Sequence, residues 1–256
     1  RGAAIATVSA QVIALLWQLK QFNNANELLH FRRGIFRLKR KIVFDSLAIG
    51  MSPFLMNLAA CLIVILINQG LKKYGGDLAI GAFGIVNRLV FIVVMIVMGL
   101  NQGMQPIAGY NFGAKLYDRV NKVLKLTIIY ATCVTTFGFL VGMLAPNLVV
   151  GIFTSDAELT ELSATGLRIT VMFFPIIGFQ MVTSNFFQSI GMAGKAIFLS
   201  LTRQMLILLP CLLILPHFFG VAGVWYSMPV SDLLASLIAL VMLVYQFRKF
   251  KTAAAH

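Results

Sequence analysis

Long apolar runs separated by short polar segments make up most of this chain. A membrane-spanning helix needs about 20 predominantly apolar residues. By this criterion the pattern predicts one partial span at about 2–18, followed by six complete spans. The complete spans cover about 43–71, 78–104, 121–145, 167–191, 195–216 and 221–246. The sequence therefore predicts an all-α polytopic membrane protein with a six-helix transmembrane bundle and a partial helix before it.

Turn and proline signals subdivide these spans. The glycine pair within 72–77 predicts a tight turn, and Pro106 is expected to end or kink the helix that contains it. Residues 155–158 fit a capping box, so a helix should start there. Pro53 and Pro175 each remove a helical hydrogen bond at membrane depth. They are candidate hinges for alternating access, and static kinks are the alternative.

The composition agrees with this class of protein and changes how the charge is interpreted. The chain is 59% hydrophobic, with a mean hydropathy of +0.90 and a formal net charge of +13. In a soluble protein such a charge would suggest a nucleic-acid partner. Here only 11% of the residues are charged, and the basic residues lie in loops between apolar runs. That distribution is typical of orientation in a bilayer, so we expect no nucleic-acid partner.

The basic residues also predict which side of the membrane each loop faces. Fifteen of the 21 Lys and Arg lie in the loops after the partial span, the second span and the fourth span, or at the C-terminus. The opposite loops hold only Lys72, Lys73 and Arg168. Because positive loops stay inside the cell, we expect a cytoplasmic C-terminus in a bacterial plasma (inner) membrane.

Four regions follow from this reading of the chain. Residues 1–18 are predicted to end a preceding bundle, 19–41 to form a basic cytoplasmic linker, and 42–250 to form the six-helix bundle. The tail at 251–256 resembles a cloning scar. Arg1 opens inside an apolar run without a start methionine, so we expect an upstream half as a partner.

Candidate enzymatic chemistry is weak. Cys61, Cys133 and Cys211 lie inside apolar runs without a C-x-x-C pair, and we interpret them as packing residues. The three histidines are scattered and form no metal-binding or catalytic motif. We therefore expect no enzyme, no cofactor and no metal site.

Charges at membrane depth are costly and are functional candidates by default. The chain has three: Arg88, Arg203 and Asp232. The turn before the last span centres near residues 217–218, so Arg203 and Asp232 lie at similar depth on antiparallel neighbours at a rise of about 1.5 Å per residue. We predict that they pair. The pair either fixes helix register or serves as an ion-coupling site, and both roles stay open.

Several uncharged polar side chains also lie within the spans. Hydrogen bonding between helices explains any one of them, but as a set they suggest a wet cavity. Met56 and Phe179 belong to the apolar residues that would give such a cavity an adaptable lining for flat cationic drugs. Together with these two, the substrate-binding or cavity candidates are Asn57, Asn87, Arg88, Gln180, Asn185 and Gln188.

The segment 98–120 reads MGLNQGMQPIAGYNFGAKLYDRV and resembles the loop after the eighth helix of the multidrug and toxic compound extrusion (MATE) transporters. Gly2–Thr7, Phe153–Glu158 and Gly220–Trp225 are similar to that family in order and spacing, and Phe179-Gln180 matches a pair in its tenth helix. The resemblance implies twelve helices in two bundles around a central cavity, with this chain as the C-terminal half.

One departure from that family concerns the coupling ion. Sodium-coupled members carry a glutamate in the seventh helix and an acidic residue in the tenth. This chain has Asn57 and Cys61 after Pro53 in the first of these helices, and Gln180 in the second. The resemblance therefore leaves the coupling ion open between proton and sodium.

The resemblance implies a secondary active multidrug exporter. Such a cation-coupled antiporter would export cationic or amphipathic compounds by alternating access, with membrane lipid as its surroundings. A lipid-linked sugar or polysaccharide flippase of related architecture is the alternative, because it would share the fold. A membrane enzyme or a non-transporting membrane protein ranks third, since no reactive cluster was found.

Overall fold

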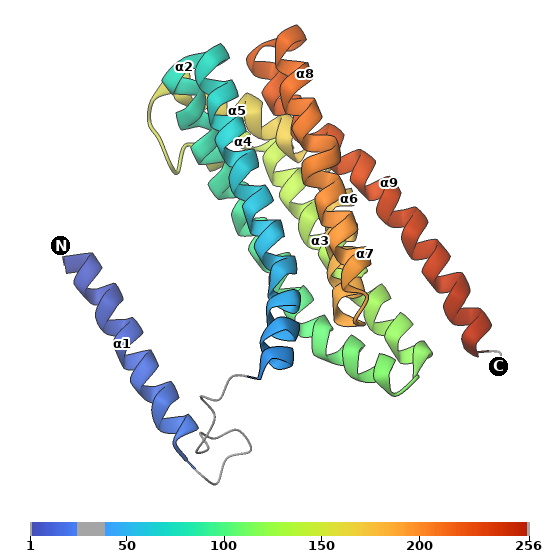
Figure 1. Cartoon of the computed structure of the whole chain (residues 1–256). Helices are drawn as coiled ribbons and strands as arrows, with labels where there is room; N and C mark the ends of the chain where they lie inside the picture. Colours follow the sequence, from blue (N-terminus) through green and yellow to red (C-terminus); the bar gives the residue numbers. More distant parts are fainter. Residues whose placement is uncertain (1, 25–38, 255–256) are drawn as a thin grey trace. The chain divides into compact units, whose positions relative to one another are not determined.

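The computed structural model describes residues 2–24 and 39–254, and all regular secondary structure within these ranges is helical (Figure 1). Arg32, Arg33 and Arg37 of the predicted linker and the last two residues of the tail lie outside the described residues. The chain divides into two compact units, Arg1–Met51 and Ser52–His256. Each unit is described by itself below.

The first unit contains α1 (Gly2–Phe22), which is the predicted partial span extended by one turn. Its sequence is apolar on every side, and large side chains such as Ile13 and Trp17 are exposed. A helix that is apolar all round is stable when lipid or another protein surface covers it. Unit 1 also includes the first residues of α2 (Arg40–Gly113).

α2 is two helices joined at Gly76, where the backbone leaves helical geometry (φ 68°, ψ −163°). A positive φ is costly for residues with a Cβ atom, so glycine suits this position. The chain reverses direction there, as the predicted turn required (Figure 1). The second limb continues to Gly113. Of the two outcomes predicted for Pro106, the helix does not end there, because losing one hydrogen bond is tolerated when the following residues remain helical; a kink stays a prediction.

α3 (Tyr117–Leu144) ends before Pro146, where the short helix α4 (Pro146–Val150) begins. The next span is a bent pair, α5 (Ala157–Val171) and α6 (Phe174–Ser189), whose axes differ by 55°.

α5 begins one residue later than the capping box predicted. Asp156, not Ser155, is the N-cap, and its Oδ1 accepts a hydrogen bond from the backbone N–H of Leu159 at 3.0 Å. The span also starts ten residues before the predicted 167, because this capped segment and the membrane segment form one bent element.

The last two spans form an antiparallel pair. α7 (Ala193–Leu201), the π-helical segment η1 (Thr202–Leu208) and α8 (Leu209–Phe219) follow one another without a break. α9 (Val221–Ala254) returns beside them after a turn at Gly220 (Figure 1).

Four helical segments among the described residues are long and apolar enough to cross a membrane, and the bent pair α5–α6 gives a fifth. One of the four, Asn57–Gly113, is 57 residues long and contains the Gly76 reversal. At about 1.5 Å per residue it is far longer than a hydrocarbon core of about 30 Å. Its two limbs therefore account for the first two predicted spans, which gives the six-helix bundle.

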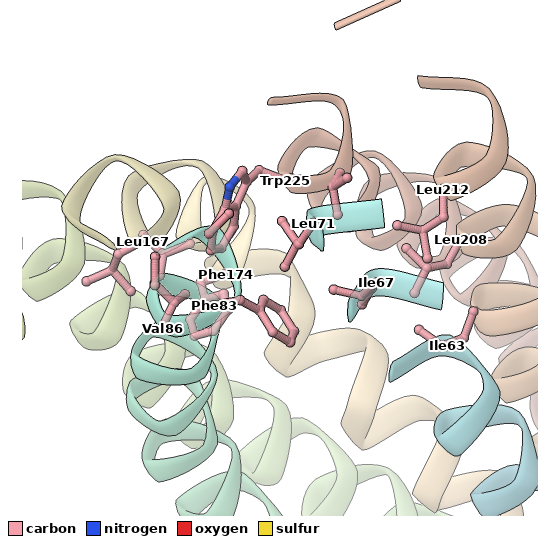
Figure 2. Close-up of a cluster of buried hydrophobic side chains, with 14 of the residues drawn as sticks. Ile63, Ile67, Leu71, Phe83, Val86, Leu167, Phe174, Leu208, Leu212 and Trp225 are labelled. Carbon is pink, nitrogen blue, oxygen red and sulfur yellow. The ribbon is translucent and has the colours of Figure 1, made fainter. Parts of the chain in front are cut away.

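Two clusters of buried side chains hold the bundle together. One contains Phe83 of α2, Phe174 of α6 and Trp225 of α9, with the Phe83 and Trp225 ring centroids 5.9 Å apart (Figure 2). The other contains Phe186 and Phe187 of α6, both fully buried. Cys61 and Cys133 are exposed, so the interpretation of these two as packing residues is wrong. An apolar thiol also suits a lipid-facing position.

Candidate functional site

An ion pair joins η1 to α9 inside the bundle. Arg203 Nε donates to Asp232 Oδ1 at 2.6 Å, which confirms the predicted pairing. The Asp232 side chain is 5% exposed and that of Arg203 33%. A carboxylate buried at membrane depth requires a positive partner, because its desolvation is otherwise too costly.

Arg203 belongs to a stretch of π-helix inside an otherwise α-helical span. In η1 the backbone hydrogen bonds join residues five apart instead of four. The N–H of Leu209, for example, donates to the carbonyl of Gln204. Short π-helical segments occur often at functional sites, because the widened turn changes where consecutive side chains point. Here both Arg203 and Gln204 line one cavity.

That cavity has a volume of about 270 Å³ and lies between α2, α5, α6, η1 and α9. Liquid water occupies about 30 Å³ per molecule, so several waters fit. Apolar side chains form much of its wall, among them Phe83 and Phe174, which also belong to the buried cluster drawn in Figure 2. Among the described residues, Arg203 and Asp232 are its only charged lining side chains. The uncharged polar ones are Asn87, Thr170, Gln204 and Ser231.

The hydroxyl groups of the cavity already donate their protons. Thr170 Oγ1 donates to the carbonyl of Gly166 at 2.8 Å, and Ser231 Oγ donates to that of Met228 at 2.7 Å. Their oxygen lone pairs can still accept hydrogen bonds or contact a cation. Gln204 Oε1 is buried and makes no hydrogen bond among the described residues. The cavity therefore presents acceptor oxygens beside the ion pair.

The structure gathers some of the predicted site residues and separates others. Asn87 lines the cavity with Arg203 and Asp232. Gln180 is buried elsewhere in α6, and Asn185 accepts a long hydrogen bond from Gln105 at 3.4 Å. These two therefore belong to the interior of the bundle but not to this cavity.

The remaining candidates lie on other surfaces. Asn57, Arg88 and Gln188 are exposed. Phe179 lines a separate, largely apolar cavity of about 250 Å³ against α9. The side chains of Pro53 and Met56 lie outside the described residues, although both positions fall within α2.

Pro175 lies in the first turn of α6, at the 55° bend. In an unbroken helix the ring of Pro175 would clash with the backbone carbonyl four residues earlier, at residue 171. Whether the bend moves as a hinge stays a prediction.

Sequence reasoning missed three polar lining residues, Thr170, Gln204 and Ser231. A signal was present for two of them, because Gln204 and Ser231 directly adjoin the charged pair in the sequence. Thr170 had no such signal, since a threonine in an apolar run is common and bonds to its own helix. Among the described residues, no group of three or more His, Cys, Asp and Glu could hold a metal ion.

An apolar helical bundle with a charged pair on a cavity between its helices is typical of membrane transport proteins. The MatE family model matches residues 48–214, and the chain belongs to this family.

Among curated relatives, the multidrug export protein MepA of Staphylococcus haemolyticus is 27% identical over 251 residues, which is 96% of this chain and 54% of that protein. MepA of Staphylococcus aureus strain MSSA476 gives the same values. The chain thus spans about half the length of the curated relatives it matches, which fits the C-terminal half of a transporter.

Solved structures agree in fold. The MATE multidrug transporter DinF-BH, solved as a complex with a ligand, superposes with a TM-score of 0.83 at 36% identity, over 97% of this chain and 56% of that one. An outward-facing multidrug resistance MATE transporter gives a TM-score of 0.85 at 21% identity, over 98% and 57% respectively. At that lower identity the second match shows the fold alone.

Proposed function

We propose that this chain is half of a secondary active multidrug exporter of a bacterial plasma membrane, with its C-terminus in the cytoplasm. Inward movement of a coupling cation would drive outward movement of cationic or amphipathic compounds. The two bundles would alternate access to a cavity between them. Support comes from the MatE family match and from relatives named as multidrug export proteins.

The observation that carries the proposal is the Arg203–Asp232 pair on a cavity between the helices of the membrane bundle, which other polar side chains also line. A static pair needs no cavity, whereas a carboxylate that exchanges a proton needs room for water beside it. Protonation of Asp232 would remove the charge that holds Arg203, so η1 and α9 could separate. The pair thereby links proton uptake to helix movement.

The substrate class follows from the relatives and from the chain's apolar surfaces. DinF-BH is named as a multidrug transporter, and the MepA proteins are named for multidrug export. Phe179 and the other large apolar side chains can adapt to ligands of varied shape, and aromatic rings attract cations. We therefore expect flat aromatic cations such as ethidium to be exported.

The flippase alternative is less favoured by the geometry. A lipid pyrophosphate would require several unpaired cationic side chains. In the cavity Arg203 is already paired with Asp232, and Arg88 lies outside it. The described residues of this half thus offer little for a pyrophosphate.

Ethidium efflux from cells expressing the whole transporter tests the function. The proton gradient is collapsed with an uncoupler, and sodium is varied independently against choline. We expect the uncoupler to stop efflux and sodium to have no effect. Asp232→Asn should reduce efflux to the level of cells without the transporter, while Asp118→Asn, at an exposed position of α3, should leave it intact.

Other results would redirect the proposal. Efflux that follows the sodium gradient would place the coupling site elsewhere than the ion pair. Intact, uncoupler-sensitive efflux by Asp232→Asn would reduce the pair to a structural role. If no cation is exported under any condition, the result would favour the flippase alternative.

A further inference from the structure

The ion pair leaves part of each partner unused. Arg203 bonds Asp232 only through Nε, so its terminal nitrogens make no hydrogen bond to the described residues. The second carboxylate oxygen of Asp232 likewise has no hydrogen-bond donor among them. Both side chains line the cavity, which therefore contains unsatisfied charge-bearing groups of each sign.

The cavity that Asp232 lines also contains the oxygen ligands that a small monovalent or divalent cation prefers. The acceptor oxygens come from one carboxylate, two amides and two hydroxyls, and hard cations bind such oxygens. Gln204 Oε1 is the clearest of these, because it is buried without a hydrogen-bond partner among the described residues. The four uncharged contributors are Asn87, Thr170, Gln204 and Ser231.

The guanidinium group of Arg203 decides whether a cation can use those oxygens. Arg203 and Asp232 are the only charged side chains among the described lining residues, so the lining has no net charge. A sodium ion would have to displace Arg203 from Asp232 and then remain close to an uncompensated positive charge. A proton also leaves the guanidinium without its counter-charge, but it bonds directly to one carboxylate oxygen and needs neither a coordination shell nor the position that Arg203 occupies.

We propose that Arg203 is a tethered counter-ion that excludes sodium from this cavity and leaves the proton as the cation that reaches Asp232. Removing the guanidinium would uncover a sodium site formed by the Asp232 carboxylate and its neighbouring oxygens. The inference deepens the proposed ion coupling and rests on it for its physiological meaning, but sodium binding can be measured without transport.

The test measures sodium binding to the purified whole transporter in detergent. ²²Na⁺ binding and the thermal unfolding midpoint are followed in NaCl against choline chloride at equal ionic strength. The variants are Arg203→Met, which keeps an unbranched apolar stem, and Arg203→Gln as a second neutral variant. Arg203→Lys retains a tethered positive charge and serves as the matched control.

We expect no saturable sodium binding at Asp232 in the wild-type protein or in Arg203→Lys. In Arg203→Met and Arg203→Gln, we expect one saturable site and a sodium-dependent rise in the unfolding midpoint. At a sodium concentration of about 100 times Kd, the folding equilibrium should shift by about 100-fold. Adding Asp232→Asn to either neutral variant should abolish both signals.

Two results would overturn the inference. One is wild-type sodium binding that Asp232→Asn removes, because Arg203 would then not exclude the ion; this result is accessible even if both neutral variants fail to fold. The other is a folded Arg203→Met or Arg203→Gln protein that binds no sodium. If sodium binds as expected in these variants but the wild-type transporter exports no ethidium, the result counts against the exporter function and not against this inference.

Discussion

Gly166 of α5 lies directly against the indole ring of Trp225 of α9. A Cβ atom placed on Gly166 would be 2.7 Å from two carbons of the ring, closer than real side chains pack. Trp225 is 3% exposed and also contacts Phe83 of α2, so its ring cannot move aside easily. The absence of a side chain at Gly166 is what lets α5 and α9 approach each other.

Gly166→Ala should therefore destabilise the bundle, although alanine is the better helix former. Overpacking a filled interior costs about 1–3 kcal/mol in free energy of unfolding. Denaturant unfolding of the purified protein in detergent measures the change. Gly84→Ala is the matched control, because its Cβ would meet no atom within 4 Å. Equal stabilities for the two variants would contradict the close packing.

A double-mutant cycle should show that breaking the Arg203–Asp232 pair costs more than removing it. Either Arg203→Met or Asp232→Leu alone leaves one uncompensated charge in the bundle, at a cost of about 3–5 kcal/mol. The double variant, which leaves no charge, should recover most of that loss in the same unfolding measurement. If the two single losses simply add in the double variant, the two side chains are not coupled.

Lys195, in the first turn of α7, contacts one residue of α9 and one residue near the end of α6. Its Nζ donates to Gln246 Oε1 at 2.5 Å and lies 5.3 Å from the centroid of the Phe187 ring. Gln246 is 1% exposed, so Lys195→Met should leave its carbonyl oxygen unsatisfied and cost about 2 kcal/mol in unfolding free energy.

The same change at exposed Lys125 should have an effect within about 0.5 kcal/mol. Adding Gln246→Leu to Lys195→Met should restore part of the stability, because both polar partners are then gone. A Lys195→Met protein as stable as the Lys125→Met control would show that this contact contributes little.

Asp156 is the N-cap of α5, and its side chain accepts a hydrogen bond from the backbone N–H of Leu159. Asp156→Ala should cost about 1 kcal/mol and increase amide hydrogen exchange in the first turn of α5. Glu161→Ala removes an equal charge at a position beyond the cap. Hydrogen exchange that rises equally in both variants would assign the effect to net charge instead of capping.

Local features of the sequence predicted much of the fold. The apolar runs match the bilayer thickness, so their length and spacing fixed the helical class and the order of the spans. The Gly76 reversal was visible because only a glycine-rich turn separates two apolar runs. Counting residues from the turn near Gly220 placed Arg203 and Asp232 at the same depth, which is why their pairing could be predicted.

The candidate site depended on contacts that no local pattern contains. Thr170 and Ser231 meet Asn87 in one cavity only because their helices are rotated and packed in a particular way, and packing is settled by side chains far apart in the sequence. The π-helical turn at 202–208 changes that rotation within one span. Length and polarity of the segments thus determined that helices cross a membrane, while tertiary packing decided which polar groups share an interior.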